Sequence, residues 1–296
     1  MAVTADSMPK PAAVSRSPTW TRMKDALRRH PTAIIGGIVL LLLIGMAIFA
    51  PFLGTIDPQA ISPVRRLRKP SEAYWFGTDM LGRDIYSRVV YGARVSLTVG
   101  LSVAVFATLL GLAIGLVTGF VRWLDGFVMR IMDGLMSIPG ILLAIALMAL
   151  TKASLENVIL AITVTEVPRV VRLIRSPVLT LREQPYVEAA IASGTRTPRI
   201  LVRHILPNTI APLLVQATYI CASAMLTEAI LSFLGAGTPP NIPSWGNIMA
   251  EGRSLFQIAN YLIFFPGVFL SLAVLSVNML GDGLRDALDP RLARNM

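Results

Sequence analysis

Charged residues are scarce in this chain of 296 residues: only 15% of its positions are Asp, Glu, Lys or Arg, whereas 54% are hydrophobic. A soluble globular chain carries about 25% charged and roughly 45–50% apolar residues. This deficit excludes an ordinary soluble domain and predicts a chain that is solvated by lipid. The formal net charge of +10 does not indicate nucleic-acid binding, because the basic residues lie between apolar runs and form no single face.

Residues that enzymes use are also few. The chain has four lysines, and none of them belongs to a Gly-x-x-x-x-Gly-Lys-Ser/Thr phosphate loop, so the sequence excludes ATP hydrolysis by this chain. It has two histidines, His30 and His204, and a single cysteine, Cys221, which can form no intrachain disulfide. This inventory supports neither a nucleophilic triad nor a Cys/His metal centre. We therefore expect no enzyme activity, no bound cofactor and no metal in this chain.

The sequence is rich in long apolar runs. A membrane-crossing helix needs about 20 mostly apolar residues, and the sequence predicts an all-α membrane protein with six such helices. The first covers 33–53, and the others lie near 95–120, 127–150, 155–174, 208–234 and 261–280. We expect 1–32 to be a cytoplasmic segment with an interfacial helix, 54–94 an outer loop, 95–282 a core of five helices, and 283–296 a cytoplasmic tail.

The distribution of Lys and Arg predicts the orientation. If the amino terminus is cytoplasmic, most basic residues fall on inner segments, as the positive-inside rule requires, and both termini are cytoplasmic. The outer loop is an exception, with four basic residues between Arg65 and Lys69. The first apolar run is longer than the roughly 7–15 residues of a signal sequence, which favours an uncleaved anchor.

The stretch 175–207, between the fourth and fifth predicted spans, predicts two short helices. Pro185 favours a first helical position, and Glu188 is an acid in that first turn, where the helix dipole stabilises it. Gly194 favours a helix end, because glycine adopts left-handed backbone angles without strain. Thr197-Pro198 then indicates an N-cap followed by the proline that opens a second helix.

The residues of this stretch resemble the EAA motif of binding-protein-dependent ABC importers. The resemblance is carried by Glu188-Ala189-Ala190, Gly194 and Leu206-Pro207 at the family spacing, with His204 where the family has isoleucine. In that family the EAA helix sits in a groove of an ATPase subunit and transmits its closure to the membrane helices. The resemblance therefore implies that these residues couple the chain to an ATPase.

Further stretches resemble one branch of that family, the C-type permeases of dipeptide, oligopeptide and nickel importers. They are Phe76–Asp84 with Tyr91–Arg94, Ser232–Gly235 and Gly281–Pro290. The resemblance implies a type I importer-like fold in the bacterial cytoplasmic (inner) membrane. It also implies a second, B-type permease as partner, two ABC ATPase subunits that bind ATP and Mg, and an extracytoplasmic solute-binding protein.

Two acidic residues lie inside predicted spans, where charged groups usually face a bundle interior or a cavity. Glu166 lies near the middle of the fourth span with Arg169 three residues on, so an ion pair and a solute contact are both open. Glu228, in the fifth span, is a candidate for the translocation path, and a structural role is equally open. We expect Asp133 to pair locally with Arg130.

In the outer loop, Asp79, Arg83 and Asp84 are candidates for contact with the binding protein or an outer gate. They belong to two Gly-x-Asp units that begin at Gly77 and Gly82. A calcium site needs six to eight oxygen ligands, which this loop does not supply, and turns that Gly and Asp stabilise are the favoured interpretation.

The predicted function is that of a permease subunit for dipeptides or oligopeptides. An alternative in the same machinery is a permease for nickel or another chelated solute. An ion-coupled secondary carrier is an alternative from another class; it predicts internal repeats and no need for an ATPase. A membrane scaffold without a transport role is a third interpretation.

Overall fold

The computed structural model describes residues 31–288, and no β-strand occurs in that range. The interfacial helix expected before the first span and the end of the tail lie outside it. The helices are α2 (Pro31–Ile48), α3 (Ile85–Phe120), α4 (Arg122–Ser137), α5 (Gly140–Ala149), α6 (Leu155–Leu181), α7 (Pro185–Ala192), α8 (Thr197–Ile200), α9 (Leu206–Phe233), α10 (Trp245–Gly252) and α11 (Tyr261–Leu288). A π-helical turn covers Leu201–Ile205, and short 3₁₀ turns cover Ala50–Phe52, Pro63–Arg65 and Arg253–Leu255.

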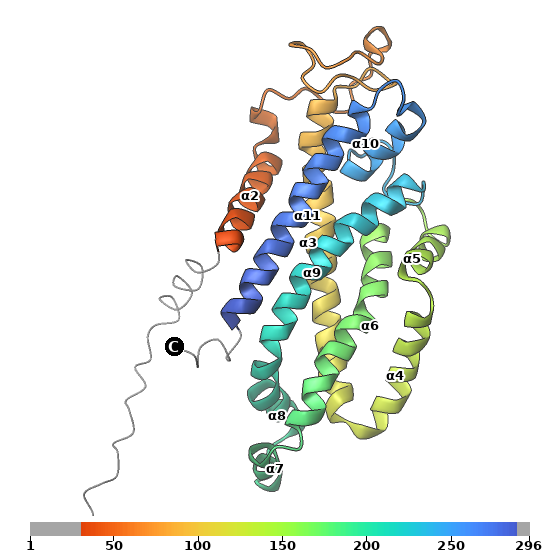
Figure 1. The fold of residues 1–296 in the computed structure, drawn as a ribbon. Helices are drawn as coiled ribbons and strands as arrows, with labels where there is room; N and C mark the ends of the chain where they lie inside the picture. Colours follow the sequence, from red (N-terminus) through yellow and green to blue (C-terminus); the bar gives the residue numbers. More distant parts are fainter. Residues whose placement is uncertain (1–30, 289–296) are drawn as a thin grey trace, which may run out of the picture.

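The long helices form one elongated bundle. In Figure 1, α2, α11, α9 and α6 follow one another across the view, and α3 runs behind them and packs against all four. The pair α4–α5 flanks α6. The short helices α7 and α8 lie at one end of the bundle, and the loop 54–84 and α10 lie at the other, so the two ends are separated by the length of the long helices.

Within residues 31–288, four helical segments are long and apolar enough to cross a membrane: α2, α3, the continuous rod Thr197–Phe233 and α11. The bent pair α4–α5 makes a fifth if it is counted as one span. By length and composition the count is therefore four or five, where the sequence predicted six. The remaining expected span corresponds to α6, a 27-residue helix inside the bundle whose charged residues, such as Glu166 and Arg169, lower its hydropathy.

Several helix boundaries differ from the prediction, among them those of the first three predicted spans. The helix expected to start at 95 starts at Ile85, because the Asp84 side chain accepts the Ser87 N–H at 2.8 Å and caps it. The outer loop therefore ends at 84. The third span is two helices bent by 90°. Ile138, which precedes Pro139, is extended, as a residue before proline usually is. The first span ends at Ile48, and Phe49 is not helical.

The most extensive helix contact is between α3 and α6. A Cβ added at Gly111 would lie 2.4 Å from the Cβ of Val170, and one at Gly115 would lie 2.9 Å from the Cβ of Ile174. Side chains larger than glycine therefore do not fit at these positions. In lipid, where van der Waals packing drives helix association, such small residues let two backbones approach.

Candidate functional site

Helix α7 is built by the residues that the sequence singled out. Pro185 stands at its start, and Glu188 lies in its first turn. The helix ends in a Schellman motif: the Gly194 N–H donates to the Ile191 carbonyl at 2.9 Å, and the Thr195 N–H donates to the Ala190 carbonyl at 3.0 Å. Gly194 has a φ of +76°, in the left-handed region that favours glycine.

Only one side of α7 is attached to the bundle. Val187 is fully buried in the core and anchors the helix, together with Ile200 and Ile205 of the following segments. Glu188 and Ala189 are exposed. The side chain of Ile191 is also half-exposed, although it is apolar. The helix thus presents a small, partly apolar surface at the end of the bundle (Figure 1).

The segment after Gly194 is joined directly to a long helix. The chain turns through Thr195 and Arg196, and α8, the π turn and α9 then run as one rod, Thr197–Phe233. Leu206 and Pro207 form the first turn of α9. Pro207 lacks an N–H and cannot make the helical backbone bond, which accounts for the distorted turn that precedes it. The rod that follows α7 extends toward the opposite end of the bundle (Figure 1).

This arrangement corrects two details of the prediction for 175–207. Helix α6 continues to Leu181, so the linking segment is shorter than expected. The second short helix starts at Thr197, with Arg196 and not Thr197 at the N-cap position, and it merges with α9. The reason is that all residues from Leu201 to Leu206 keep helical angles, so nothing ends the helix before the span.

Near the middle of α6, polar groups from two helices meet. The Arg169 guanidinium donates to the Glu166 carboxylate at 3.1 Å and lies over the Tyr219 ring of α9, 5.5 Å from its centroid. The Ser223 hydroxyl, also on α9, donates to Glu166 at 3.4 Å. Of the two roles left open for Glu166, the ion pair with Arg169 is present. Sequence reasoning did not find Tyr219 and Ser223, because they come from another helix.

Further along α6, two arginines hold α4. Arg172 reaches Asp133 at 2.5 Å, and Arg175 contacts both oxygens of Asp125 at 2.5 and 2.7 Å. The expected local pair of Asp133 with Arg130 is therefore wrong. Asp133 lies on the side of α4 that faces α6, and α6 supplies a guanidinium there. Asp133 and Arg172 are both exposed, so this ion pair lies at the surface of the bundle.

Glu228 is fully buried in α9. Its Oε1 atom accepts the hydroxyls of Ser232 at 2.9 Å, Ser244 at 2.8 Å and Thr238 at 3.5 Å. Ser244 also caps α10 by accepting the Asn247 N–H. Through Oε1 Glu228 joins the end of α9 to α10, whereas its Oε2 is buried and has no hydrogen-bond partner among the described residues.

The residues expected at an outer face meet in a network of ion pairs that links the loop 54–84, α3 and α10. Asp79 Oδ2 lies 2.6 Å from Arg83 Nε and 2.6 Å from Arg88 Nη1. Glu251 of α10 contacts Arg83 at 2.7 Å and Arg88 at 2.6 and 2.8 Å. Asp84 does not join this network, since it caps α3. Gly77 and Gly82 have φ values of +79° and +73° and form the turns of the loop.

Arg88 and Glu251 complete this network, and sequence reasoning missed both. Arg88 could have been identified from the sequence, because it is a charged residue close to the first turn of a span. Glu251 could not have been identified in this way, since it lies far along the chain from the loop. In the described part of the chain, no three His, Cys, Asp or Glu side chains are grouped as a metal site would require.

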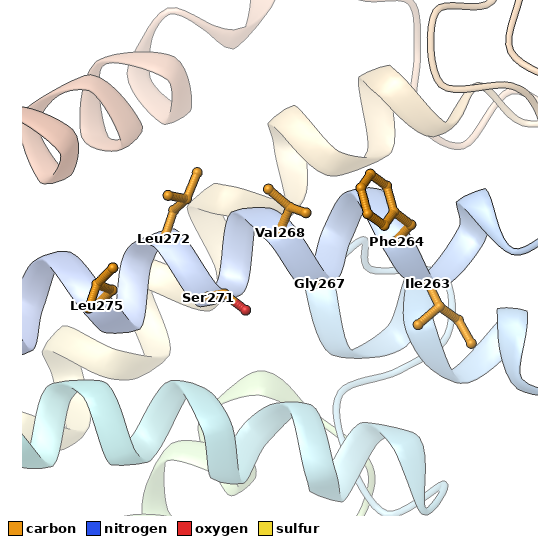
Figure 2. A pocket seen from close by; sticks show the side chains of 7 residues that line it. All are labelled: Ile263, Phe264, Gly267, Val268, Ser271, Leu272 and Leu275. Atoms are coloured by element: carbon orange, nitrogen blue, oxygen red, sulfur yellow. The ribbon is translucent and has the colours of Figure 1, made fainter.

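An apolar pocket lies along one side of α11. It is lined by seven residues between Ile263 and Leu275. Figure 2 shows Phe264, Val268 and Leu272 pointing to one side of α11 and Ile263 and Ser271 to the other, with Gly267 between them.

The chain is similar to known transport proteins over nearly its whole length. Residues 107–294 match the family described as binding-protein-dependent transport system inner membrane component, and residues 19–70 match the N-terminal TM domain of oligopeptide transport permease C. A relative from Sinorhizobium fredii named "Probable peptide ABC transporter permease protein" is 55% identical, covering 90% of this chain and 91% of its own. A dipeptide transport system permease protein from Alkalihalophilus pseudofirmus is 44% identical, covering 92% and 90%.

A third relative is named a glutathione transport system permease protein, from Pectobacterium atrosepticum, and is 40% identical over 92% of this chain and 90% of its own. Among solved structures, a chain of the MetNI methionine ABC transporter in an inward-facing conformation matches with a TM-score of 0.56. The identity is 23%, over 68% of this chain and 97% of the other. That likeness concerns the fold, which is the type I importer-like fold expected from the sequence.

Proposed function

The chain belongs to the family of binding-protein-dependent transport system inner membrane components, and we propose that it is the permease subunit of an ATP-driven importer of dipeptides or oligopeptides. The peptide solute is supported by relatives at 44–55% identity that are named peptide and dipeptide permeases. The single structural observation that carries the proposal is α7, a partly apolar helix that is exposed at the end of the bundle and joined by a short turn to a long rod.

In this proposal α7 docks in a groove of an ABC ATPase subunit. Glu188, Ala189 and Ala190 lie on the docking helix, and Gly194 allows the chain to reverse direction into the rod that begins before Leu206-Pro207. Closure of the two ATPases on ATP and Mg then moves α7, and the rod carries that movement through the membrane. This chain supplies no ATP site of its own, so the nucleotide and its metal belong to the partners.

Two further partners and the orientation of the chain follow from the same proposal. A second, B-type permease subunit packs beside this chain, and the solute passes between the two. A solute-binding protein docks at the end formed by the loop 54–84 and α10, where Asp79, Arg83 and Asp84 order the loop. Both termini are then cytoplasmic and the chain lies in the bacterial inner membrane, with α7 on the cytoplasmic side.

The test is uptake of a labelled dipeptide by liposomes that contain this chain, its partner permease and the ATPases, with the binding protein outside and ATP inside. The proposal predicts uptake that needs ATP and the binding protein. Uptake driven by a proton or sodium gradient without any ATPase would contradict it and would favour a secondary carrier.

A further inference from the structure

Arg169 occupies an unusual position for a charged residue. It lies near the midpoint of the 27-residue α6, about 20 Å from either end at 1.5 Å per residue. Its side chain is nevertheless 47% exposed. A guanidinium at that depth is costly in contact with lipid, and such groups face a water-filled cavity, a partner or a solute.

The guanidinium of Arg169 is only partly used. A guanidinium has five N–H donors, and among residues 31–288 this one donates a single hydrogen bond, to Glu166 at 3.1 Å. Its neighbour Arg175 differs, because Asp125 binds it through both carboxylate oxygens. Arg169 therefore keeps an open edge that has the geometry for two parallel N–H···O bonds to another carboxylate.

The surroundings of Arg169 suit a solute that comes and goes. Glu166 balances its charge when no solute is present, so the site is stable when empty. Tyr219 supports the guanidinium from α9 and is itself half-exposed, and the hydroxyl of Ser223 lies beside Glu166. If an acidic residue of another subunit neutralised Arg169 permanently, Glu166 would not be needed for charge balance. The presence of Glu166 therefore favours a ligand that binds only transiently.

We propose that Arg169, supported by Tyr219, binds a carboxylate of the transported solute, namely the C-terminal carboxylate of a peptide. This inference rests on the proposed function of the chain as a peptide permease. It makes Arg169 a specificity-determining contact in the translocation path, with Glu166 as the group that holds the guanidinium in place.

The test compares uptake of a peptide with uptake of its C-terminal amide, using a pair that the binding protein binds with equal affinity. The unmodified complex should prefer the free acid by about tenfold or more, the size expected for hydrogen bonds between charged groups. Arg169→Gln should reduce that preference to about one, and Arg169→Lys should keep part of it. The control Arg172→Gln, a neighbouring arginine that Asp133 pairs, should keep all of it.

Three other outcomes would each contradict at least one of the two proposals. An unchanged preference in Arg169→Gln would overturn the inference and leave the proposed function intact. Failure of both Arg169 variants to assemble with the second permease would also overturn it, because Arg169 would then be an interface residue. Absence of ATP-driven uptake by the unmodified complex would overturn the proposed function, and this inference with it.

Discussion

Arg88 and Glu251, which are 163 residues apart in the sequence, form a bidentate ion pair. Nη1 of Arg88 lies 2.6 Å from Oε2 of Glu251, and Nη2 lies 2.8 Å from Oε1. Arg88 is almost fully buried, and its Nη1 also contacts Asp79. The pair therefore fastens α10 to the start of α3 at the end of the bundle opposite α7.

Removal of Glu251 should destabilise this end of the protein. Glu251→Ala leaves Arg88 with Asp79 alone, and the loss of hydrogen bonds to charged groups costs about 1.5–3 kcal/mol. Thermal unfolding of the purified protein in detergent should show a lower midpoint. Glu72→Ala, at an exposed position of the loop 54–84, is the matched control and should leave the midpoint unchanged. Equal midpoints for the two variants would show that the network does not stabilise the fold.

The contact between α3 and α6 should tolerate no added side chain. Gly115→Val places new atoms against Ile174, where even a Cβ would lie at 2.9 Å, and overpacking costs about 1–3 kcal/mol. The variant should accumulate in the membrane at a lower level than the unmodified chain. Gly45→Ala on α2, where no atom lies within 4 Å, should accumulate normally. Normal accumulation of Gly115→Val would contradict the close approach of the two helices.

Glu228 should act through its hydrogen bonds and not through contact with the solute. Glu228→Gln keeps an oxygen that accepts the hydroxyls of Ser232 and Ser244, so peptide uptake should stay within about twofold of the unmodified complex. Glu228→Ala leaves these buried hydroxyls without their acceptor, which costs about 1–3 kcal/mol, and should reduce the amount of folded protein. A Gln variant that is folded but inactive would indicate a direct role in the path.

Gly194 should accept only residues that tolerate left-handed backbone angles. With a φ of +76° and no atoms near its missing Cβ, strain and not crowding decides the effect of a substitution. Asn adopts this region readily, whereas a β-branched residue does so at a cost of about 1–2 kcal/mol. Gly194→Asn should therefore keep ATP-driven uptake, and Gly194→Val should lower it by about tenfold. Equal uptake by both variants would show that the turn need not be left-handed.

Local signals predicted the α7 segment well. Pro185 and Gly194 impose their own backbone angles, so the start and the end of this helix follow from single residues. The start of α3 was missed by ten residues, because an apolar run predicts where lipid begins and not where a helix begins. Asp84, the residue that starts the helix, was assigned instead to the outer contact.

The contacts between helices were not predictable from one sequence. Asp133 has Arg130 within reach on its own helix, yet it pairs with Arg172 of α6, because the side of α4 that carries Asp133 faces α6. The partners of Glu228 and Glu251 likewise lie on other helices or loops. Such pairs depend on how helices are arranged in space, and local periodicity carries no information about that arrangement.

The proposed link between α7 and the ATPases can be measured in reconstituted complexes. In reconstituted complexes, ATP hydrolysis stimulated by peptide-loaded binding protein should be lost in Glu188→Lys, because the reversed charge lies on the exposed docking helix. Glu156→Lys changes an exposed acid in the first turn of α6, at the other end of the bundle, and should keep the stimulation. Full stimulation in an assembled Glu188→Lys complex would contradict the assignment of α7 as the coupling helix.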